Sequence, residues 1–417
     1  MSINNSDLII IFAPAGVDTK LLTSDLAGRP LIDYLIENVA VLGIRVKLIV
    51  LNNYDELYAL LVNRDDIDLK VWQSGVSLDE LLDYPLREGV LLLLDVRTFM
   101  FSSLTIERLL EKKREKLNSL KIIEGKYVDT YTIAQAISGE KDWSDILTFR
   151  FDSQQSNLNE LLCLFLTTQS DVICTKDIDE FKPPVMIRDF VELAQVERQV
   201  LNQRAIDLMK QGVRIRNPET VEIRGELLCG REVEIDVNVI IKGKVSLADG
   251  VKVGSNSILI RSEIGERTEI KPYSIVEDAV VGADSFVGPY GRVRPGSTLG
   301  DRVQLGNFVE IKSSYIASGC RINHLSFIGD ADLAENVTVG AGTITCNYDG
   351  IGVNHTVVEE GVTIGSGCNL VAPIEIGSNA TIGAGSTITS DVPKNKLTLA
   401  RSRQITKEKW QGPKTRR

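Results

Sequence analysis

The sequence is poor in the residues that build metal sites and disulfide frameworks. Its 417 residues include two histidines and six cysteines, and no two cysteines have the Cys-x-x-Cys spacing of a zinc site. We therefore expect no zinc centre and reduced thiols, as in a cytoplasmic protein. No stretch reaches the roughly 18 apolar residues that span a bilayer, and the start, MSINNSDLIIIFAPAG, lacks the basic residues of a signal peptide. These absences predict a cytoplasmic protein that does not associate with membranes.

Positive charge is scarce as well. The net charge of −10 argues against nucleic acid as the main partner, because a phosphate backbone is bound by a basic surface. Residues 401–417 reverse this balance with a net charge of +6, which leaves −16 on residues 1–400. We interpret 401–417 as a separate basic tail, which is either a solvated end or a segment that holds a polyphosphate-bearing cofactor.

The chain contains few aromatic residues and many glycines, 3 Trp, 10 Tyr and 11 Phe against 33 Gly, which favours many turns around small side chains. Its length predicts two domains. Over residues 1–187, strand-like apolar runs alternate with helix-length segments, which is typical of a Rossmann-like α/β domain with a parallel sheet. The runs are Leu8–Phe12, Val46–Leu51, Leu69–Val71 and Val90–Leu94.

A connecting helix is predicted over 188–213, where apolar residues recur at near-helical spacing: Leu193, Val196, Val200, Ala205, Leu208 and Met209. From 214 to 400 aliphatic residues instead recur every six positions. The three longest runs are Val221, Leu227, Val233, Val239, Val245, Val251; then Val287, Val293, Leu299, Leu305, Ile311; and Ile364, Leu370, Ile376, Ile382, Ile388. Period six fits neither a helix nor an alternating strand. It predicts a parallel β-helix with coils of about 18 residues and one inward aliphatic side chain per side.

This register slips at three places, near Ser262, near Tyr315 and through residues 344–355, where we expect loops to leave the coil. A β-sandwich is the alternative, but its turns would recur every 8–12 residues.

Several motifs in the second half carry a specific resemblance. They are GPYGRVRPG (288–296), LGNFVEIK (305–312), INHLSFIGDADL (322–333), VGAGTITCNYDG (339–350), IGSGCNLVAPIEIG (364–377) and SRQITKEKW in the tail. From about Leu193 onward the chain resembles the acetyltransferase half of bacterial GlmU, the bifunctional enzyme of UDP-N-acetylglucosamine synthesis. The resemblance implies a left-handed β-helix, a homotrimer, acetyl-coenzyme A as co-substrate and glucosamine 1-phosphate as acceptor.

Acetyl transfer to an amine needs a base for the amine proton and donors for the thioester oxyanion. His324 and His355 are the two histidines available as base. The resemblance assigns His324 as the catalytic base, because it stands where the family has its catalytic histidine, and His355 is interpreted as part of a loop.

The resemblance also assigns the two substrates. Arg294 and Lys312 match residues that bind the acceptor phosphate, and Phe327 and Thr338 stand where the family has a tyrosine and an asparagine against the sugar. A third phosphate cation, a lysine in the family, is Val353 here, and His355 and Asn354 are candidate substitutes for it. The donor residues implied for acetyl-coenzyme A are Ala341, Asn347, Tyr348, Ser366, Ala384 and Arg401.

The first half has lost most of what the family uses for uridylyl transfer. The Gly-rich phosphate loop reads Ala13 to Leu21, with Pro14 removing a backbone donor and Asp18 placing a carboxylate where phosphate should approach. Asp95 matches the metal-binding aspartate, but its asparagine partner is replaced by Arg188 or Asp189. We interpret residues 1–187 as a shortened relic without uridyltransferase activity, so Mg²⁺ would be needed only if this domain retained activity.

The leading hypothesis is a cytoplasmic acetyl-coenzyme A-dependent acetyltransferase with His324 as general base. One alternative is acetylation of a different amino sugar, because the acceptor residues are altered. The other is a catalytically silent trimeric scaffold, which would keep the same fold.

Overall fold

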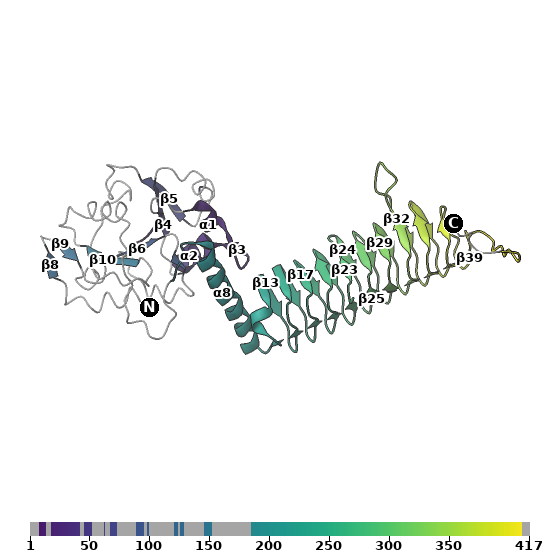
Figure 1. The fold of residues 1–417 in the computed structure, drawn as a ribbon, viewed down its shortest axis with the longest axis horizontal. Coiled ribbons are helices and arrows are strands. Elements are labelled where there is room, and N and C mark those ends of the chain that lie inside the picture. Colours follow the sequence, from purple (N-terminus) through teal and green to yellow (C-terminus); the bar gives the residue numbers. More distant parts are fainter. Residues whose placement is uncertain are drawn as a thin grey trace, which may run out of the picture. The chain divides into compact units, whose positions relative to one another are not determined.

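The computed structural model describes residues 8–13, 18–41, 46–51, 62, 67–72, 89–95, 98–99, 121–123, 126–128, 146–151 and 185–410. The chain divides into two compact units, Met1–Val200 and Leu201–Arg417. Figure 1 shows an α/β unit and a long coil of short strands, which confirms the predicted combination of fold classes.

The first unit is built on a five-stranded sheet in the order β10-β6-β1-β4-β5. Its strands β1, β4, β5 and β6 run parallel and β10 is antiparallel to β6. All four strand-like runs of the sequence lie in this sheet, and the order around β1 is that of a doubly wound fold. The sheet consists of β1 (Leu8–Ala13), β4 (Val46–Leu51), β5 (Ile67–Trp72), β6 (Gly89–Asp95) and β10 (Ile146–Phe151).

The remaining described elements of this unit are short, apart from helix α2 (Leu31–Ala40), which buries Ile32, Leu35 and Ile36 completely. The others are α1 (Thr19–Thr23), β2 (Asp25–Leu26), β3 (Arg29–Pro30), β7 (Thr98–Phe99), β8 (Lys121–Ile123), β9 (Lys126–Val128) and β11 (Val185–Met186).

Helix α8 (Phe190–Lys210) occupies the segment predicted as the connector. Asp189 caps it, because its Oδ1 accepts from the amides of Val191 and Glu192 at 2.9 and 2.8 Å. Five of the six apolar residues of the predicted helix are buried, whereas Met209 is 41% exposed. A 3-10 turn, η1 (Pro218–Thr220), follows strand β12 (Arg214–Ile215). No helix that the structure describes is long and apolar enough to cross a membrane.

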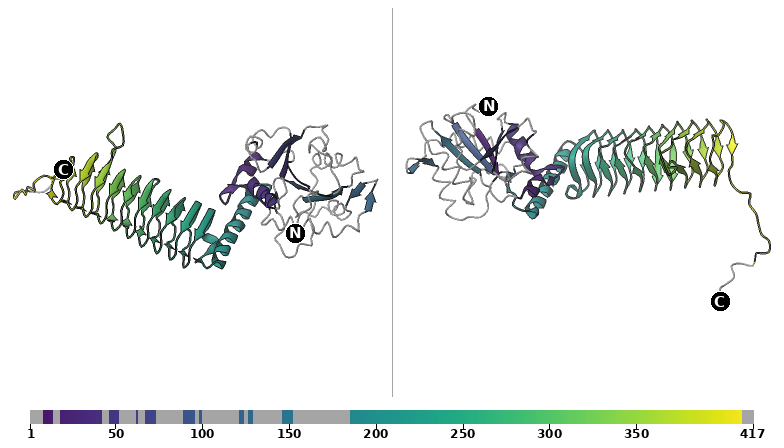
Figure 2. Two further views of the ribbon diagram at one scale, coloured as in Figure 1. Left: turned by 180° about the vertical axis from the view of Figure 1, so that it is seen from behind. Right: turned by 90° about the horizontal axis from the view of Figure 1, so that it is seen from above.

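The second unit is a left-handed parallel β-helix with three strand ladders (Figure 2). The first ladder consists of β12, β14 (Glu234–Ile235), β16 (Lys252–Val253), β19 (Glu269–Ile270), β22 (Phe286–Val287), β25 (Gln304–Asn307), β28 (Arg321–His324), β31 (Thr338–Val339), β34 (Thr363–Ile364), β37 (Thr381–Ile382) and β39 (Leu397–Thr398).

The other two ladders are joined through the long strands β13 and β15. The second consists of β13 (Glu222–Cys229), β15 (Ile240–Leu247), β17 (Ile258–Ile260), β20 (Ile275–Glu277), β23 (Arg292–Val293), β26 (Glu310–Lys312), β29 (Phe327–Gly329), β32 (Ile344–Cys346), β35 (Asn369–Val371) and β38 (Thr387–Ile388). The third consists of β18 (Glu263–Ile264), β21 (Ala279–Val281), β24 (Ser297–Leu299), β27 (Tyr315–Ile316), β30 (Ala331–Leu333), β33 (Thr356–Val358) and β36 (Ile374–Ile376).

The predicted hexad residues form the core of this β-helix. Every aliphatic residue of the three long runs is at most 9% exposed, and all belong to one hydrophobic cluster. Burying one Val, Leu or Ile side chain contributes about 1.5–3 kcal/mol, so the repeat itself supplies the stabilisation. Strand partners lie 18 residues apart in regular coils, for example Ile240 with Ile258, as predicted for three hexads.

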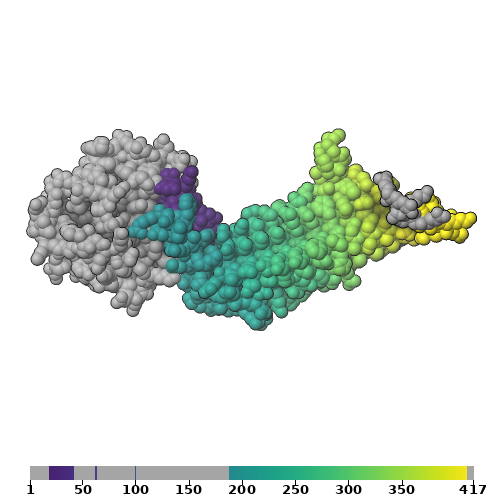
Figure 3. Space-filling view, in the orientation of Figure 1, coloured from purple at the N-terminus to yellow at the C-terminus, as the bar shows by residue number. Residues whose placement is uncertain are grey.

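The prediction of loops near Ser262 and Tyr315 is wrong. At both places the coil is shortened to 17 residues, as the pairing of Ile258 with Ile275 and of Thr298 with Tyr315 shows. The chain turns these corners with one residue fewer, and Arg261 and Ser313 adopt positive φ angles of 41° and 44° there. The third slip does produce a loop: partners Ala331 and Thr356 are 25 residues apart, and residues 347–355 protrude from the coil (Figure 3).

Candidate active site

One corner of the β-helix gathers His324 and most of the residues assigned to the donor. In each coil the amide following a corner residue donates to the carbonyl oxygen of the corner residue in the preceding coil, at 2.7–3.4 Å. These bonds place the members of the corner row one above another in successive coils. The corner row consists of Asn307, His324, Ala341, Ser366 and Ala384.

The position that follows the corner row changes character at His324. Up to that point it carries exposed bulky side chains, which we call the aromatic ladder: Tyr273, Tyr290, Phe308 and Leu325, each 48–62% exposed. The rings of Tyr290 stack on both aromatic neighbours, with centroids 5.0 and 5.1 Å apart. Beyond His324 the same position is glycine, and we call Gly342, Gly367 and Gly385 the glycine strip.

The glycine strip leaves open space along the corner row. Positive φ angles near 70° favour glycine at these positions, and a Cβ on Gly367 or Gly385 would meet no atom within 4 Å. With coils about 4.8 Å apart, the strip extends roughly 14 Å from His324 to the level of Ala384. An extended chain-like ligand can therefore lie along this corner with its reactive end at His324.

Asn307 orients the imidazole of His324. The distance between His324 Nδ1 and Asn307 Oδ1 is 2.8 Å, and the histidine is exposed at the corner. The amide oxygen accepts the Nδ1 proton, which leaves the lone pair of Nε2 free, as a general base requires. Asn307 was missed from the sequence, although the 17-residue coil places it directly before His324 in the row.

The two candidate phosphate cations lie on the second ladder. Arg294 directly follows β23 and Lys312 ends β26, so both occupy the same side in successive coils. Each is half-buried and paired with a carboxylate: Arg294 Nη1 lies 3.0 Å from Glu310 Oε1, and Lys312 Nζ lies 3.3 Å from Asp330 Oδ2. The sequence analysis did not identify either carboxylate.

Phe327 and Asn347 lie beside Lys312, around Gly329. Gly329 pairs with Lys312 in the ladder, and a Cβ added to it would lie 2.6 Å from Phe327 Cζ and 3.0 Å from Asn347 Nδ2. The absence of a side chain at Gly329 therefore makes room for the ring and the amide. Asn347 also donates to Asp330 Oδ2.

Thr338 does not join this cluster within one chain. It lies exposed on β31, in the first ladder, where it pairs with Arg321 of β28. Lys312 and Phe327 belong to the second ladder, and the corner with His324 separates the two ladders. The four residues predicted to bind the acceptor are thus divided between two faces of the same chain.

The excursion 347–355 exposes Tyr348 (65%) and Val353 (56%), which are paired through an isolated bridge. Asp349 holds the turn: amide hydrogen bonds from Gly352 and Ile351 and the side chain of Asn354 lower its pKa to about 2. Because Asn354 donates to Asp349, its amide is already engaged within the turn.

The second candidate substitute for the missing cation, His355, is engaged as well. Its Nε2 lies 3.0 Å from Asp332 Oδ2 on the third ladder, away from Lys312. The structure therefore brings neither substitute to the phosphate cations.

The tail returns to the corner row at its first residue. Arg401 Nη1 donates to the carbonyl oxygen of Ala384 at 2.7 Å, so two residues assigned to the donor meet at the end of the glycine strip. Beyond this contact, residues 402–410 are exposed and leave the coil without regular secondary structure (Figure 2).

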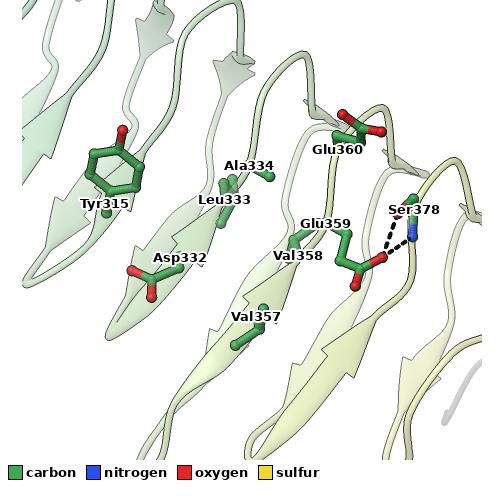
Figure 4. Close-up of a pocket in the computed structure, with 9 residues that line it drawn as sticks. All are labelled: Tyr315, Asp332, Leu333, Ala334, Val357, Val358, Glu359, Glu360 and Ser378. Carbon is green, nitrogen blue, oxygen red and sulfur yellow. Dashed lines mark hydrogen bonds between the residues drawn. The ribbon is translucent and has the colours of Figure 1, made fainter.

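A separate groove of about 680 Å³ runs along the third ladder between β27 and β36 (Figure 4). It is lined by Tyr315, Asp332, Leu333, Ala334, Val357, Val358, Glu359, Glu360 and Ser378. Glu359 accepts from the amide of Ser378 at 2.7 Å and from its hydroxyl. The three carboxylates among these lining residues oppose an anionic sugar phosphate, so this groove is not the acceptor site.

The residues assigned to uridylyl transfer are described only in part. Asp95 ends β6, where its backbone pairs with Phe12 of β1, and the predicted phosphate loop at residues 14–17 lies outside the described residues. Asp18 caps α1 by accepting from the amide of Lys20 at 2.9 Å. In the described residues, no group of three His, Cys, Asp or Glu side chains is placed to bind a metal ion.

The fold and the corner row define the chain as a hexapeptide-repeat protein of the transferase type. Residues 355–390 match the model of the bacterial transferase hexapeptide (six repeats), and residues 223–324 match that of the GMPPB C-terminal domain. An Arabidopsis UDP-N-acetylglucosamine acyltransferase aligns with 45% of this chain and 70% of its own at 18% identity and a TM-score of 0.35, which is too low to support an argument.

Relatives narrow the family. The chain is 41% identical over 310 residues to the bifunctional protein GlmU of Aromatoleum aromaticum, covering 74% of this chain and 67% of that protein. It is 50% identical over 232 residues to GlmU of Methylococcus capsulatus, covering 55% and 50%. The chain belongs to the GlmU family, as its motifs predicted, and its matches span from half to two thirds of the length of these relatives.

Proposed function

We propose that this protein is an acetyl-coenzyme A-dependent N-acetyltransferase that acts on an amino sugar phosphate, with glucosamine 1-phosphate as the first candidate. The observation that carries the proposal is the corner row. It places His324, held by Asn307, at the head of an open glycine strip that ends at Ala384 and Arg401. Membership of the GlmU family supports the same reaction class.

In the proposed mechanism, His324 Nε2 accepts a proton from the acceptor amine as its nitrogen attacks the thioester carbonyl. The C–N bond forms, the C–S bond breaks, and the thiolate leaves and takes a proton. The donor lies along the glycine strip, where the Arg401 guanidinium supplies positive charge for an anionic cofactor. Arg294 and Lys312 hold the acceptor phosphate.

We also propose that the working form is a homotrimer with its sites between chains. Thr338 and Lys312 lie on different faces of one chain, so one ligand can touch both types of residue most directly when a second chain contributes one of them. The exposed aromatic ladder directly before His324 supports this, because contiguous apolar surface is usually covered by a partner. Sedimentation should give three chains per particle, and a stable monomer at micromolar concentration would refute the shared site.

We propose that uridylyl transfer is lost. Asp18 uses its carboxylate to cap α1, and both residues that align with the missing metal-binding asparagine are engaged at the start of α8: Asp189 as its cap and Arg188 in an ion pair with Glu192. The protein, incubated with UTP, Mg²⁺ and N-acetylglucosamine 1-phosphate, should release no pyrophosphate. Formation of UDP-N-acetylglucosamine would overturn this proposal.

The acceptor is the less certain half of the assignment, and one experiment resolves it. Purified protein is assayed for release of coenzyme A with glucosamine 1-phosphate and a panel of other amino sugars, alongside the double variant Phe327→Tyr, Val353→Lys. The double variant restores a hydroxyl and a cation that lost hydrogen bonds require, so the Michaelis constant for glucosamine 1-phosphate should fall at least tenfold. An unchanged or higher constant, with turnover of another amino sugar, would favour a rebuilt pocket.

Absence of turnover with every amino sugar, despite binding of acetyl-coenzyme A, would identify the protein as a silent scaffold. His324→Ala serves as the control for background hydrolysis of the thioester, because it removes the proposed base and leaves the glycine strip unchanged.

A further inference from the structure

The carboxylate of Asp330 joins two side chains that the sequence assigns to different substrates. Its Oδ2 accepts from Lys312 Nζ at 3.3 Å and from the side-chain amide of Asn347. Lys312 belongs to the proposed acceptor site, and Asn347 to the proposed donor site. With 18% of its side chain exposed, Asp330 is shielded enough for these charge-assisted bonds to fix both partners.

The backbone of Asp330 is held independently of its side chain. Its amide donates to the carbonyl oxygen of Lys312 at 2.9 Å, and its carbonyl oxygen accepts from the amide of Thr356 at 3.1 Å. Thr356 directly follows the excursion 347–355, and Asn347 is the first residue of that excursion. Asp330 therefore contacts both ends of the excursion, but it reaches the Asn347 end only through the carboxylate.

We propose that Asp330 is a positioning residue that holds Lys312 and Asn347 in a single arrangement and thereby couples acceptor binding to donor binding. This inference rests on the proposed function for the roles of its two partners. Asp330 itself need touch no reacting atom. Both bonds end on one oxygen, so a change in the charge of this carboxylate reaches both substrate sites at once.

The test compares Asp330→Asn with Asp332→Asn in the full-length protein. Asparagine keeps the shape of the side chain and tolerates the positive φ of 52° at this corner, so the coil should remain intact. Asp332 lies two residues further along the chain and pairs with His355 instead, which makes it a matched loss of one carboxylate.

For Asp330→Asn we expect the Michaelis constant of the acceptor and the Kd of coenzyme A each to rise about threefold to tenfold, the usual effect of converting a charge-assisted hydrogen bond into a neutral one. Turnover at saturation and the thermal midpoint should stay near the values of the unmodified protein. Asp332→Asn should change neither binding constant.

A double-mutant cycle with Lys312→Met isolates the coupling. In the Lys312→Met background, Asp330→Asn should no longer raise the acceptor constant but should still weaken binding of coenzyme A. Full additivity for the acceptor, or an unchanged Kd for coenzyme A, would overturn the proposal. A fall in turnover and thermal midpoint with unchanged binding constants would indicate a merely structural residue.

Hydrogen exchange separates this inference from the proposed function, because it needs neither substrate. Peptides covering residues 344–351 should exchange faster in Asp330→Asn than in the unmodified protein, and Asp332→Asn should leave them unchanged. If the protein acetylates no amino sugar, the proposed function fails, while faster exchange together with weaker coenzyme A binding would still support Asp330 as the anchor. Unchanged exchange would refute it.

Discussion

The hydrogen bond between Asn307 and His324 offers the sharpest test of the proposed catalytic site. Asn307→Ala removes the amide oxygen that lies 2.8 Å from His324 Nδ1 and leaves the histidine in place. The imidazole of the exposed histidine can then rotate or carry its proton on Nε2, where it cannot act as a base. A single hydrogen bond of this kind contributes about 1 kcal/mol, which corresponds to about fivefold in rate.

The size of this effect should differ clearly from that of removing the base. His324→Ala should lower turnover by about 10²–10⁴, the usual contribution of a positioned general base. Asn307→Ala should lower it by about fivefold, with the Michaelis constants for donor and acceptor little changed, because Asn307 acts only through the histidine. In the double variant the effect of Asn307→Ala should vanish.

The assay is release of coenzyme A at saturating acetyl-coenzyme A and acceptor, followed for both single variants and the double variant. Asn307→Asp provides a second substitution, because a carboxylate oxygen at the same place can still accept the Nδ1 proton. Two results would refute the reasoning: a loss from Asn307→Ala as large as that from His324→Ala, or a further fivefold loss in the His324→Ala background.

Three further predictions concern the glycine strip, the excursion and a buried thiol. Gly367→Leu should weaken coenzyme A binding at least tenfold in calorimetry while leaving the acceptor constant unchanged, whereas a donor that binds elsewhere would not respond. In an NMR titration, Asp349 should show a pKa of about 2; because this lies below its ordinary value, the turn is stabilised above about pH 4 and loses that stabilisation as pH falls toward 2, so a pKa near 4 would contradict the hydrogen-bonded turn. Burial raises the pKa of Cys229 to about 11, so alkylation at pH 8 followed by peptide mass spectrometry should find it unlabelled in the native protein and labelled in urea.

The hexapeptide periodicity by itself determined the β-helix. Residues such as Val239, Val245 and Val251 stand six apart, and a corner every six residues is the geometry that buries all of them. The four apolar runs of residues 1–187 likewise predicted the strands of the parallel part of the sheet, because a strand buried on both faces reads as a continuous apolar run. The motifs were enough to identify the family and to single out His324.

The sequence could not reveal which register slips become loops. One residue fewer at Arg261 is absorbed by a tighter corner with positive φ, whereas the longer insertion at 347–355 must leave the coil. Both interrupt the repeat in a similar way, and only the backbone path distinguishes them.

The tertiary structure also decided the partners within the site. Asn307, Glu310 and Asp330 are 16 to 18 residues from the side chains they contact, a separation that acquires meaning only once the length of each coil is known. In the same way, the structure directed His355 to Asp332 and divided Thr338 from Lys312, because side chains close in a motif alternate between the faces of a triangular coil. The sequence therefore determined which residues carry the chemistry, and the stacking of coils decided which of them meet.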